Sequence, residues 1–201
     1  MHLFDFLFPP RPDDAVIRDL TRDDFLSLLR LRTVEYTTPE TVALLSFGDP
    51  VVRSAIHEAK YHGSAHAFTL LSSALVEYLR DADDGFRKPL ILPIPLGKAR
   101  NKERGYNQTE ETALRASKEL GIPIDPTLLI RTRETVSQVS LPREARVENM
   151  RGAFRATIPL SPSRTYIVID DVITTGATLQ SAIDALRETG AEHIVAIALA
   201  H

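Results

Sequence analysis

Short apolar runs alternate with longer segments of helical periodicity from Val42 onward. The runs at residues 90–94 (LILPI), 166–169 (YIVI) and 193–199 (HIVAIAL) predict buried strands, and a further strand is expected at residues 42–47 (VALLSF). Strands that are apolar on both faces occur in parallel sheets covered by helices. The pattern therefore predicts an α/β fold with a mostly parallel sheet flanked by helices.

The segments between these runs carry the signals of helix ends. Asp49 followed by Pro50 predicts a helix that stops near Gly63, while Gly121 and Gly190 are placed to end two later helices. Helices are expected at residues 50–63, 65–80, 109–120 and 176–189, with a short one from Pro142. Weaker strands are expected at residues 127–131 and 152–157, and polar loops at 81–88, 97–107 and 132–141.

The first 41 residues follow a different pattern. An apolar opening leads into Pro9, Pro10 and Pro12, and Thr21 is placed to cap a short helix that ends before Pro39. The apolar positions of this helix are Phe25, Leu26, Leu28 and Leu29. We expect residues 13–40 to be helical, residues 1–41 to form a small N-terminal cap, and residues 42–201 to form the main domain.

Composition narrows the class of protein. Of 201 residues, 43% are hydrophobic and none is cysteine, which excludes a disulfide scaffold, thiolate catalysis and cysteine-ligated zinc. No apolar run reaches the roughly 18 residues that a membrane span needs, and the opening segment lacks the basic region of a signal peptide. These features suit a cytoplasmic protein in a reducing compartment.

The net charge of −3 hides an uneven distribution of charge. Residues 85–155 contain 14 Lys/Arg and 8 Asp/Glu, a net of +6, so the rest of the chain is acidic. Such a split indicates a face that receives an anion. The overall balance argues against non-specific nucleic-acid binding as the main activity.

The segment YIVIDDVITTGATL, residues 166–179, carries the clearest chemistry. A buried strand delivers Asp170 and Asp171 at its carboxyl end, where ligands bind in open α/β sheets. The loop that follows opens a helix, whose free N–H groups and positive dipole end suit a phosphate. Gly176 lets the backbone come close, and the threonines add hydroxyl donors. Two adjacent carboxylates beside a phosphate pocket suit the vicinal hydroxyls of a ribose.

Two further segments carry the basic residues. In PIPLGKARNKERGYNQ, residues 93–108, the backbone of Gly97 and the charge of Lys98 could wrap a pyrophosphate, although a basic loop can also be merely solvated. Residues 131–154 form a long polar stretch with several arginines, which predicts either a lid over a diphosphate or a plain surface loop.

These segments resemble the phosphoribosyl pyrophosphate (PRPP) fingerprint of type I phosphoribosyltransferases. In their order along the chain they look like the ComF family, which is competence-associated and phosphoribosyltransferase-like. RGYNQ at residues 104–108 and the spacing of Gln138, Arg146 and Asn149 are the family-specific parts. The opening LFDFLFPPR (3–11) and AKYHG (59–63) match as well.

The resemblance implies a PRPP site with Mg²⁺ bound mainly through PRPP. It implies displacement of pyrophosphate from C1 by an unknown nitrogen acceptor. Asp170 and Asp171 are the implied catalytic and ribose-binding residues. The residues implied to bind the 5′-phosphate are Thr174, Thr175, Gly176, Ala177 and Thr178. The residues implied to bind the pyrophosphate or to form the lid are Leu96, Gly97, Lys98, Arg100, Arg104, Arg131, Arg133 and Arg146.

The chain departs from the family at its N-terminus. ComF proteins place a cysteine-rich zinc ribbon after the LFPPR-like opening, where this chain has Pro12 and no cysteine. We therefore expect a zinc-free cap and no protein metal site; His62 and His66 are spaced for a metal, but such pairs are usually structural. Lys60 matches a family position, and its ammonium could point toward the anionic pocket.

Two other functions stay open at this point. The chain could be a catalytically silent PRPP-sensing adaptor that acts on proteins of DNA uptake or recombination, because fold and motif do not separate an enzyme from a sensor. Direct binding of single-stranded DNA through the +6 region at residues 85–155 is a third hypothesis, which steep salt dependence would support.

Overall fold

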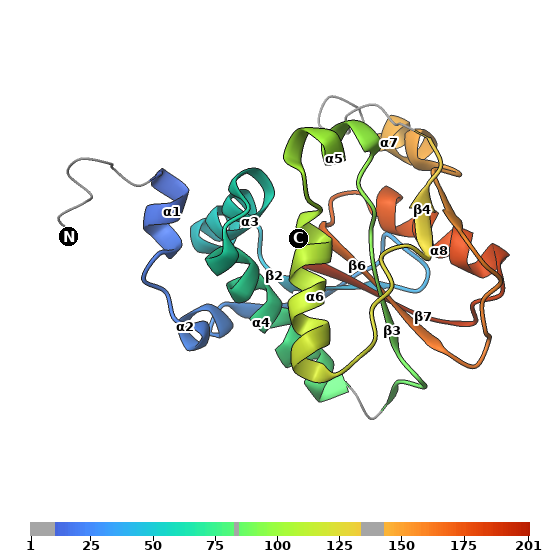
Figure 1. Cartoon of the computed structure of the whole chain (residues 1–201), viewed down its shortest axis with the longest axis horizontal. Helices are drawn as coiled ribbons and strands as arrows, with labels where there is room; N and C mark the ends of the chain where they lie inside the picture. Colours follow the sequence, from blue (N-terminus) through green and yellow to red (C-terminus); the bar gives the residue numbers. More distant parts are fainter. Residues whose placement is uncertain (1–10, 83–84, 134–142) are drawn as a thin grey trace.

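The fold is built on a five-stranded sheet in the order β1-β2-β7-β6-β3 (Figure 1). A computed structural model describes residues 11–82, 85–133 and 143–201. Strands β2, β7, β6 and β3 run parallel, and β1 pairs antiparallel with β2. The α/β fold with a mostly parallel sheet is thereby confirmed. Its strands are β1 (Leu29–Val34), β2 (Thr41–Leu45), β3 (Leu90–Pro93), β6 (Thr165–Val172) and β7 (His193–Ala200).

Helices cover both faces of this sheet. The helices α3 (Pro50–His62), α4 (Ala65–Ala82) and α6 (Gln108–Leu120) lie on one face, and α8 (Ala177–Glu188) lies on the other (Figure 1). The shorter helices are α1 (Pro12–Ile17), α2 (Arg22–Leu26), α5 (Lys98–Arg104) and α7 (Arg143–Met150). A two-stranded antiparallel sheet of β4 (Leu129–Arg131) and β5 (Phe154–Ala156) packs near α8. Among the helices described, none is long and apolar enough to cross a membrane.

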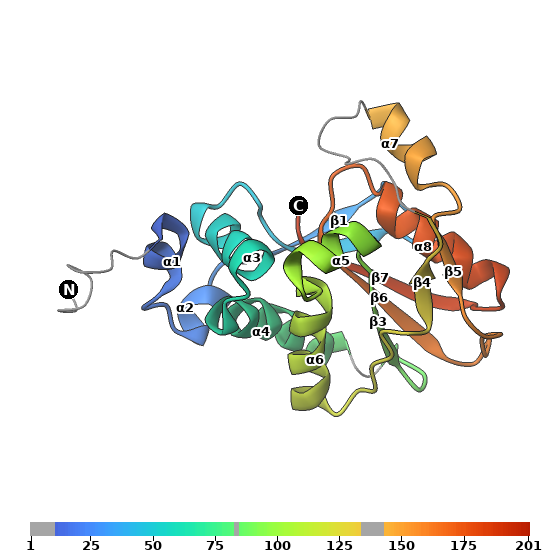
Figure 2. The same ribbon diagram turned by 45° about the horizontal axis from the view of Figure 1, so that its top comes forward.

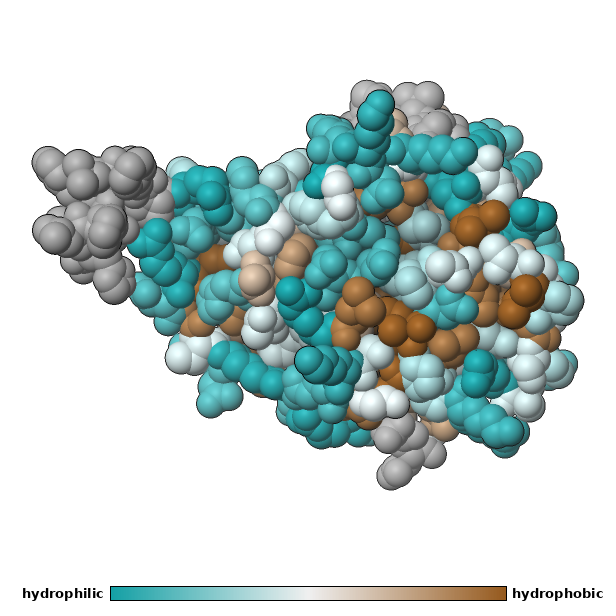
Figure 3. Space-filling model, viewed as in Figure 1, coloured by the Kyte–Doolittle hydropathy of each residue, from teal (hydrophilic) through white to brown (hydrophobic). Residues whose placement is uncertain are grey.

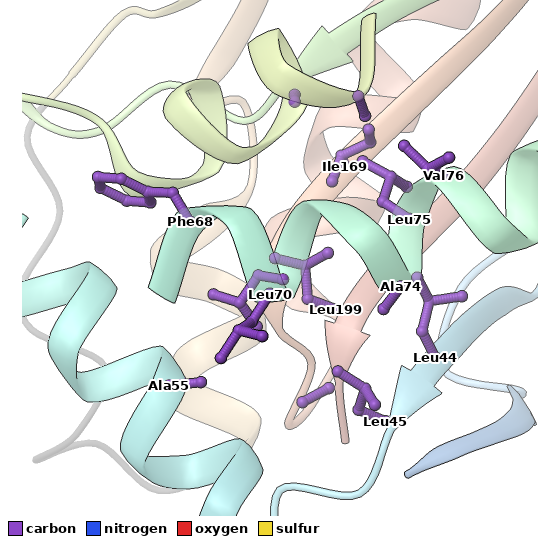
Figure 4. Close-up of a cluster of buried hydrophobic side chains, with 14 of the residues drawn as sticks. Leu44, Leu45, Ala55, Phe68, Leu70, Ala74, Leu75, Val76, Ile169 and Leu199 are labelled. Carbon is purple, nitrogen blue, oxygen red and sulfur yellow. The ribbon is translucent and has the colours of Figure 1, made fainter. Parts of the chain in front are cut away.

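The core has one layer on each face of the sheet because successive residues of a strand point to opposite faces. Ile167 and Ile169 belong to the layer under α3, α4 and α6, whereas Tyr166 and Val168 belong to the layer under α8. In the first layer, Leu75 of α4 lies against Ile169 of β6 (Figure 4). The near-continuous apolar run of β6 is therefore explained by burial on both sides.

The predicted ends of α3 are confirmed. The Asp49 side chain accepts hydrogen bonds from the N–H groups of Val51 (2.8 Å) and Val52 (3.3 Å), and Pro50 occupies the first turn, where its missing N–H costs nothing. Gly63 ends the helix in the left-handed conformation, with φ of 60°. These two ends fix α3, which carries Lys60.

Two predictions about secondary structure are wrong. Residues 98–104 form helix α5 within the expected loop 97–107, because this segment consists largely of helix-forming Lys, Arg, Ala and Glu without an apolar face to reveal it. Residues 29–34 (LRLRTV) form strand β1 within the expected helical segment 13–40, and their strict alternation is a strand signal. The boundary of a cap at residue 41 stays a prediction.

Candidate functional site

A cavity of about 300 Å³ lies where the carboxyl ends of β3 and β6 meet. The short helix α5 and the loop that joins β6 to α8 lie over this same edge of the sheet (Figure 2). The surface over α5 is hydrophilic (Figure 3). The lining residues include both acids of β6, two threonines of the following loop, and basic residues of three other elements. They are Asp170, Asp171, Thr174, Thr178, Lys60, Arg100, Arg104 and Arg131, with Phe47, Leu96 and Gln108 among the others.

The segment at residues 174–178, here called the phosphate loop, follows β6 and includes the first two residues of α8. Asp170 and all five loop residues surround one small hollow, so the structure brings the predicted 5′-phosphate residues together. Gly176 has φ of 75°, a conformation that residues with a side chain rarely adopt. A Cβ there would lie 2.7 Å from the Cβ and 2.8 Å from the carbonyl oxygen of Tyr36. The loop therefore rests directly on the β1–β2 connection.

The two adjacent acids of β6 have different surroundings. Asp171 is buried, and its Oδ2 accepts from Lys60 Nζ (2.8 Å) and Gln108 Nε2 (2.6 Å) while its Oδ1 accepts from the N–H of Val172 (2.6 Å). Burial opposes its ionised form, but the Lys60 charge and these hydrogen bonds outweigh burial and lower the pKa of Asp171. Burial, and then the charge of Asp171, raise the pKa of Asp170 to about 7.

Tyr106 and Asn107 of the RGYNQ segment contact α4, the end of α3 and the residue after β3. The ring of Tyr106 packs edge-on against Phe68 of α4, at 5.9 Å between centroids, and covers Gly63. The Asn107 amide donates to the carbonyl of Ile94 (2.9 Å), which fixes the start of α6 to the end of β3. Gln108 is thereby held against Asp171. We infer that this segment positions the start of α6 in the site.

The structure brings only some of the residues predicted to bind pyrophosphate or to form the lid to the cavity. Leu96, Arg100, Arg104 and Arg131 line it. Arg104 donates to Gln108 Oε1 (3.0 Å) and lies 5.1 Å from the centroid of the Tyr61 ring.

The remaining members of that set lie elsewhere or are not described. Gly97 and Lys98 begin α5 but are not among the lining residues, and Arg133 donates to the carbonyl of Arg151 (2.8 Å). The side chain of Arg146 and residues 134–142 lie outside the part that the structure describes, so the lid stays a prediction.

The sequence assigns no role to two residues of the site, Lys60 and Gln108. Lys60 does point its ammonium toward the acids, as the sequence allows, because it forms an ion pair with Asp171. Gln108 belongs to the RGYNQ segment, and its contact with Asp171 joins residues that are far apart in the sequence. Of the two histidines spaced for a metal, His66 bonds to the carbonyl of Ile17 (2.9 Å). Within the described ranges, no three His, Asp or Glu side chains gather as a metal site.

The fold and this site define a class of protein. The phosphoribosyl transferase domain family matches residues 86–201, which is more than half of the chain and includes the cavity's strands β3 and β6. The chain therefore belongs to the phosphoribosyl transferase domain family.

Within that class, two relatives confirm the resemblance to the ComF family. Competence protein F of Haemophilus influenzae is 36% identical over 106 residues, which cover 52% of this chain and 46% of that protein. DNA utilization protein YhgH of Escherichia coli (strain K12) is 30% identical over 145 residues, which cover 71% of this chain and 63% of that protein. The matches thus span about half to three fifths of the length of these relatives.

Solved structures of adenine phosphoribosyltransferase are also similar to this chain. The enzyme from Leishmania tarentolae is 16% identical, with a TM-score of 0.40, over 92% of this chain and 73% of that one. The enzyme from Leishmania donovani is 16% identical, with a TM-score of 0.41, over 88% of this chain and 65% of that one.

Proposed function

We propose that the chain binds PRPP together with Mg²⁺ and transfers the phosphoribosyl group to a nitrogen acceptor. The observation that carries the proposal is that Asp170, Thr174 and Thr178 line both the small hollow of the phosphate loop and the larger cavity, which three arginines from other elements also line. The ligand's 5′-phosphate, ribose hydroxyls and diphosphate would each meet groups of matching chemistry. The arginines that would meet the diphosphate are Arg100, Arg104 and Arg131.

Each part of the site has a role in this reaction. The N–H groups at the start of α8 and the threonine hydroxyls hold the 5′-phosphate. Asp170 accepts hydrogen bonds from the ribose hydroxyls. The bond from C1 to the diphosphate oxygen breaks, the acceptor nitrogen bonds to C1, and the arginines stabilise the charge that develops on the leaving pyrophosphate.

Magnesium would be held mainly by oxygens of PRPP itself. Mg²⁺ favours phosphate and water oxygens over dedicated protein cages, and the residues here fit that preference: two carboxylates, Asp170 and Asp171, and several cationic side chains line the cavity. When bound, the ion would neutralise part of the diphosphate charge.

Calorimetry of the full chain with PRPP and MgCl₂ tests this proposal. The Asp170→Asn variant should bind PRPP at least about tenfold more weakly, because a hydrogen bond to a charged group contributes roughly 1.5–3 kcal/mol. Asp19→Asn, at an exposed position, is the control and should bind like wild type. Equal affinity of Asp170→Asn and wild type would contradict the assignment of the ribose site.

A second candidate is a PRPP-sensing adaptor that does not turn PRPP over. The names of the relatives, a competence protein and a DNA utilization protein, favour a link to DNA uptake. Release of pyrophosphate with any member of a panel of bases and amines would support the enzyme. Binding of PRPP without release across the panel would support the adaptor, with proteins of DNA uptake as its partners.

A further inference from the structure

Lys60 reaches the site from outside the segment that matches the phosphoribosyl transferase domain family. It lies in the last turn of α3, and its Nζ is 2.8 Å from Asp171 Oδ2. Its side chain is only 22% exposed. A lysine ammonium is buried to this extent only when a partner compensates for lost water, and Asp171 is that partner.

Asp171 is already held by the protein at most of its acceptor positions. Three donors from three elements already occupy its two oxygens: the Lys60 ammonium of α3, the Gln108 amide of α6 and the N–H of Val172. Both acids line the larger cavity, but of the two only Asp170 also borders the phosphate loop. Within the described part of the chain, Asp170 accepts one hydrogen bond, from the N–H of Asp171 (2.9 Å), so it is the less engaged of the two acids.

We propose that Lys60 is a positioning residue, which pairs with Asp171 and so leaves Asp170 as the one carboxylate that engages the ribose hydroxyls. This inference rests on the proposed function. PRPP carries several negative charges, and two unpaired carboxylates side by side would repel it. The Lys60 ammonium cancels one of the two charges and holds Asp171 in place through its ion pair.

If Lys60 has this positioning role, the charges around Asp170 predict how PRPP affinity depends on pH. Asp171, Lys60 and Arg131 are the charged groups that act on it. Burial and Asp171 raise the pKa of Asp170, whereas Lys60 and Arg131 lower it. Removal of the Lys60 charge therefore shifts the ionisation of Asp170, and with it PRPP affinity, to higher pH.

The experiment is a calorimetric titration of the full chain with PRPP and MgCl₂ from about pH 6 to about pH 9. In Lys60→Met, the midpoint of the affinity profile should rise by about one pH unit, with about tenfold weaker binding at neutral pH, since one unit of pKa changes the ionised fraction up to tenfold. Lys60→Arg keeps the charge and should follow wild type. Lys60→Met combined with Asp171→Asn removes both charges and should bring the midpoint to that of wild type or below it, because the Asp171 charge raises the pKa of Asp170 more than the Lys60 charge lowers it.

Four outcomes would overturn the inference. Wild type and Lys60→Met could share one pH profile, or Asp171→Asn alone could weaken binding as much as Asp170→Asn. If Lys60→Met does not fold, the double variant decides, because a midpoint above that of wild type would contradict the pairing role. Absence of PRPP binding by wild type would overturn the proposed function and this inference together, whereas binding that ignores Lys60 overturns this inference alone.

Discussion

Asp170 and Asp171 show how two identical neighbouring residues acquire different chemistry. The charge of Lys60 keeps Asp171 ionised, while burial and the charge of Asp171 raise the pKa of Asp170 to about 7. A carboxyl whose pKa is higher in the folded than in the unfolded protein stabilises the fold less as pH rises. This loss begins near the ordinary pKa, about 4, and is complete above about 7. The burial of Asp170 thus reduces the stability of the fold at neutral and alkaline pH.

The Asp170→Asn substitution should therefore stabilise the ligand-free protein. We expect the free energy of unfolding to rise on the order of 2 kcal/mol near pH 8 and by much less near pH 5, where Asp170 is protonated in the folded state. Urea denaturation of wild type and variant at both pH values measures this. Asp171→Asn should instead destabilise the protein, because Lys60 loses its partner. A gain from Asp170→Asn that is equal at both pH values would contradict the charge explanation.

At the scale of elements, the phosphate loop depends on the β1–β2 connection beneath it. The positive φ of Gly176 and the 2.8 Å approach to the Tyr36 carbonyl leave no room for a side chain, because backbone atoms cannot move aside. The loop is also held from the same side by the Gln180 amide oxygen of α8, which accepts from the N–H of Thr38 (2.7 Å). A change in the β1–β2 connection should therefore also displace the phosphate loop.

Gly176→Ala should disturb both stability and ligand binding. The left-handed conformation costs about 1 kcal/mol for alanine, and the overlap with Tyr36 adds roughly 1–3 kcal/mol. The matched control is Gly121→Ala at the end of α6, where φ is 71° and nothing lies within 4 Å of the added Cβ. It should show the conformational cost alone and bind PRPP like wild type. Thermal melts and calorimetry compare the two variants; equal losses in both would refute the role of packing against Tyr36.

The sequence predicts helices and strands correctly where residues close together in the chain determine their ends. The caps of α3, the β6–α8–β7 unit and the phosphate loop follow from Asp49, Pro50, Gly176 and the apolar runs. Strand β1 is the exception: its short alternating pattern adjoins the apolar residues Phe25, Leu26, Leu28 and Leu29, which favour a helix. The partners of Asp171 could not be predicted, because Lys60 and Gln108 come from helices whose packing against β6 is a tertiary property.

Across the whole molecule, an ion pair ties the N-terminal part of the chain to the main sheet's helices. Glu58 of α3 has a fully buried side chain, and both of its oxygens accept from the Arg11 guanidinium, with 2.9 Å between Nε and Oε1. Arg11 is half exposed, so water screens its side of the pair. The ion pair lies two residues before Lys60 on the same helix, which joins the N-terminal part to the acids of the site.

Removal of Arg11 should destabilise the whole fold. In Arg11→Met the buried Glu58 carboxylate loses its cation, which should lower the free energy of unfolding by about 2 kcal/mol. Combining it with Glu58→Gln should recover part of that loss, because no buried charge remains. Arg53→Met, at an exposed position of the same helix, is the control. Chemical denaturation measures all three, and an unchanged midpoint in Arg11→Met would show that the pair contributes nothing.

The place of β2 in the sheet limits how this protein can be divided. β2 lies between β1 and β7, so the family-matching segment that begins at residue 86 lacks the strand that pairs with its own last strand. If that segment were expressed alone, β7 would be an edge strand with unpaired N–H and C=O groups, which favours aggregation. The phosphate loop would also lose its packing against Tyr36. A chimera or a minimal fragment must therefore include the β1–β2 hairpin. The segment that matches the family is shorter than the segment that completes the sheet.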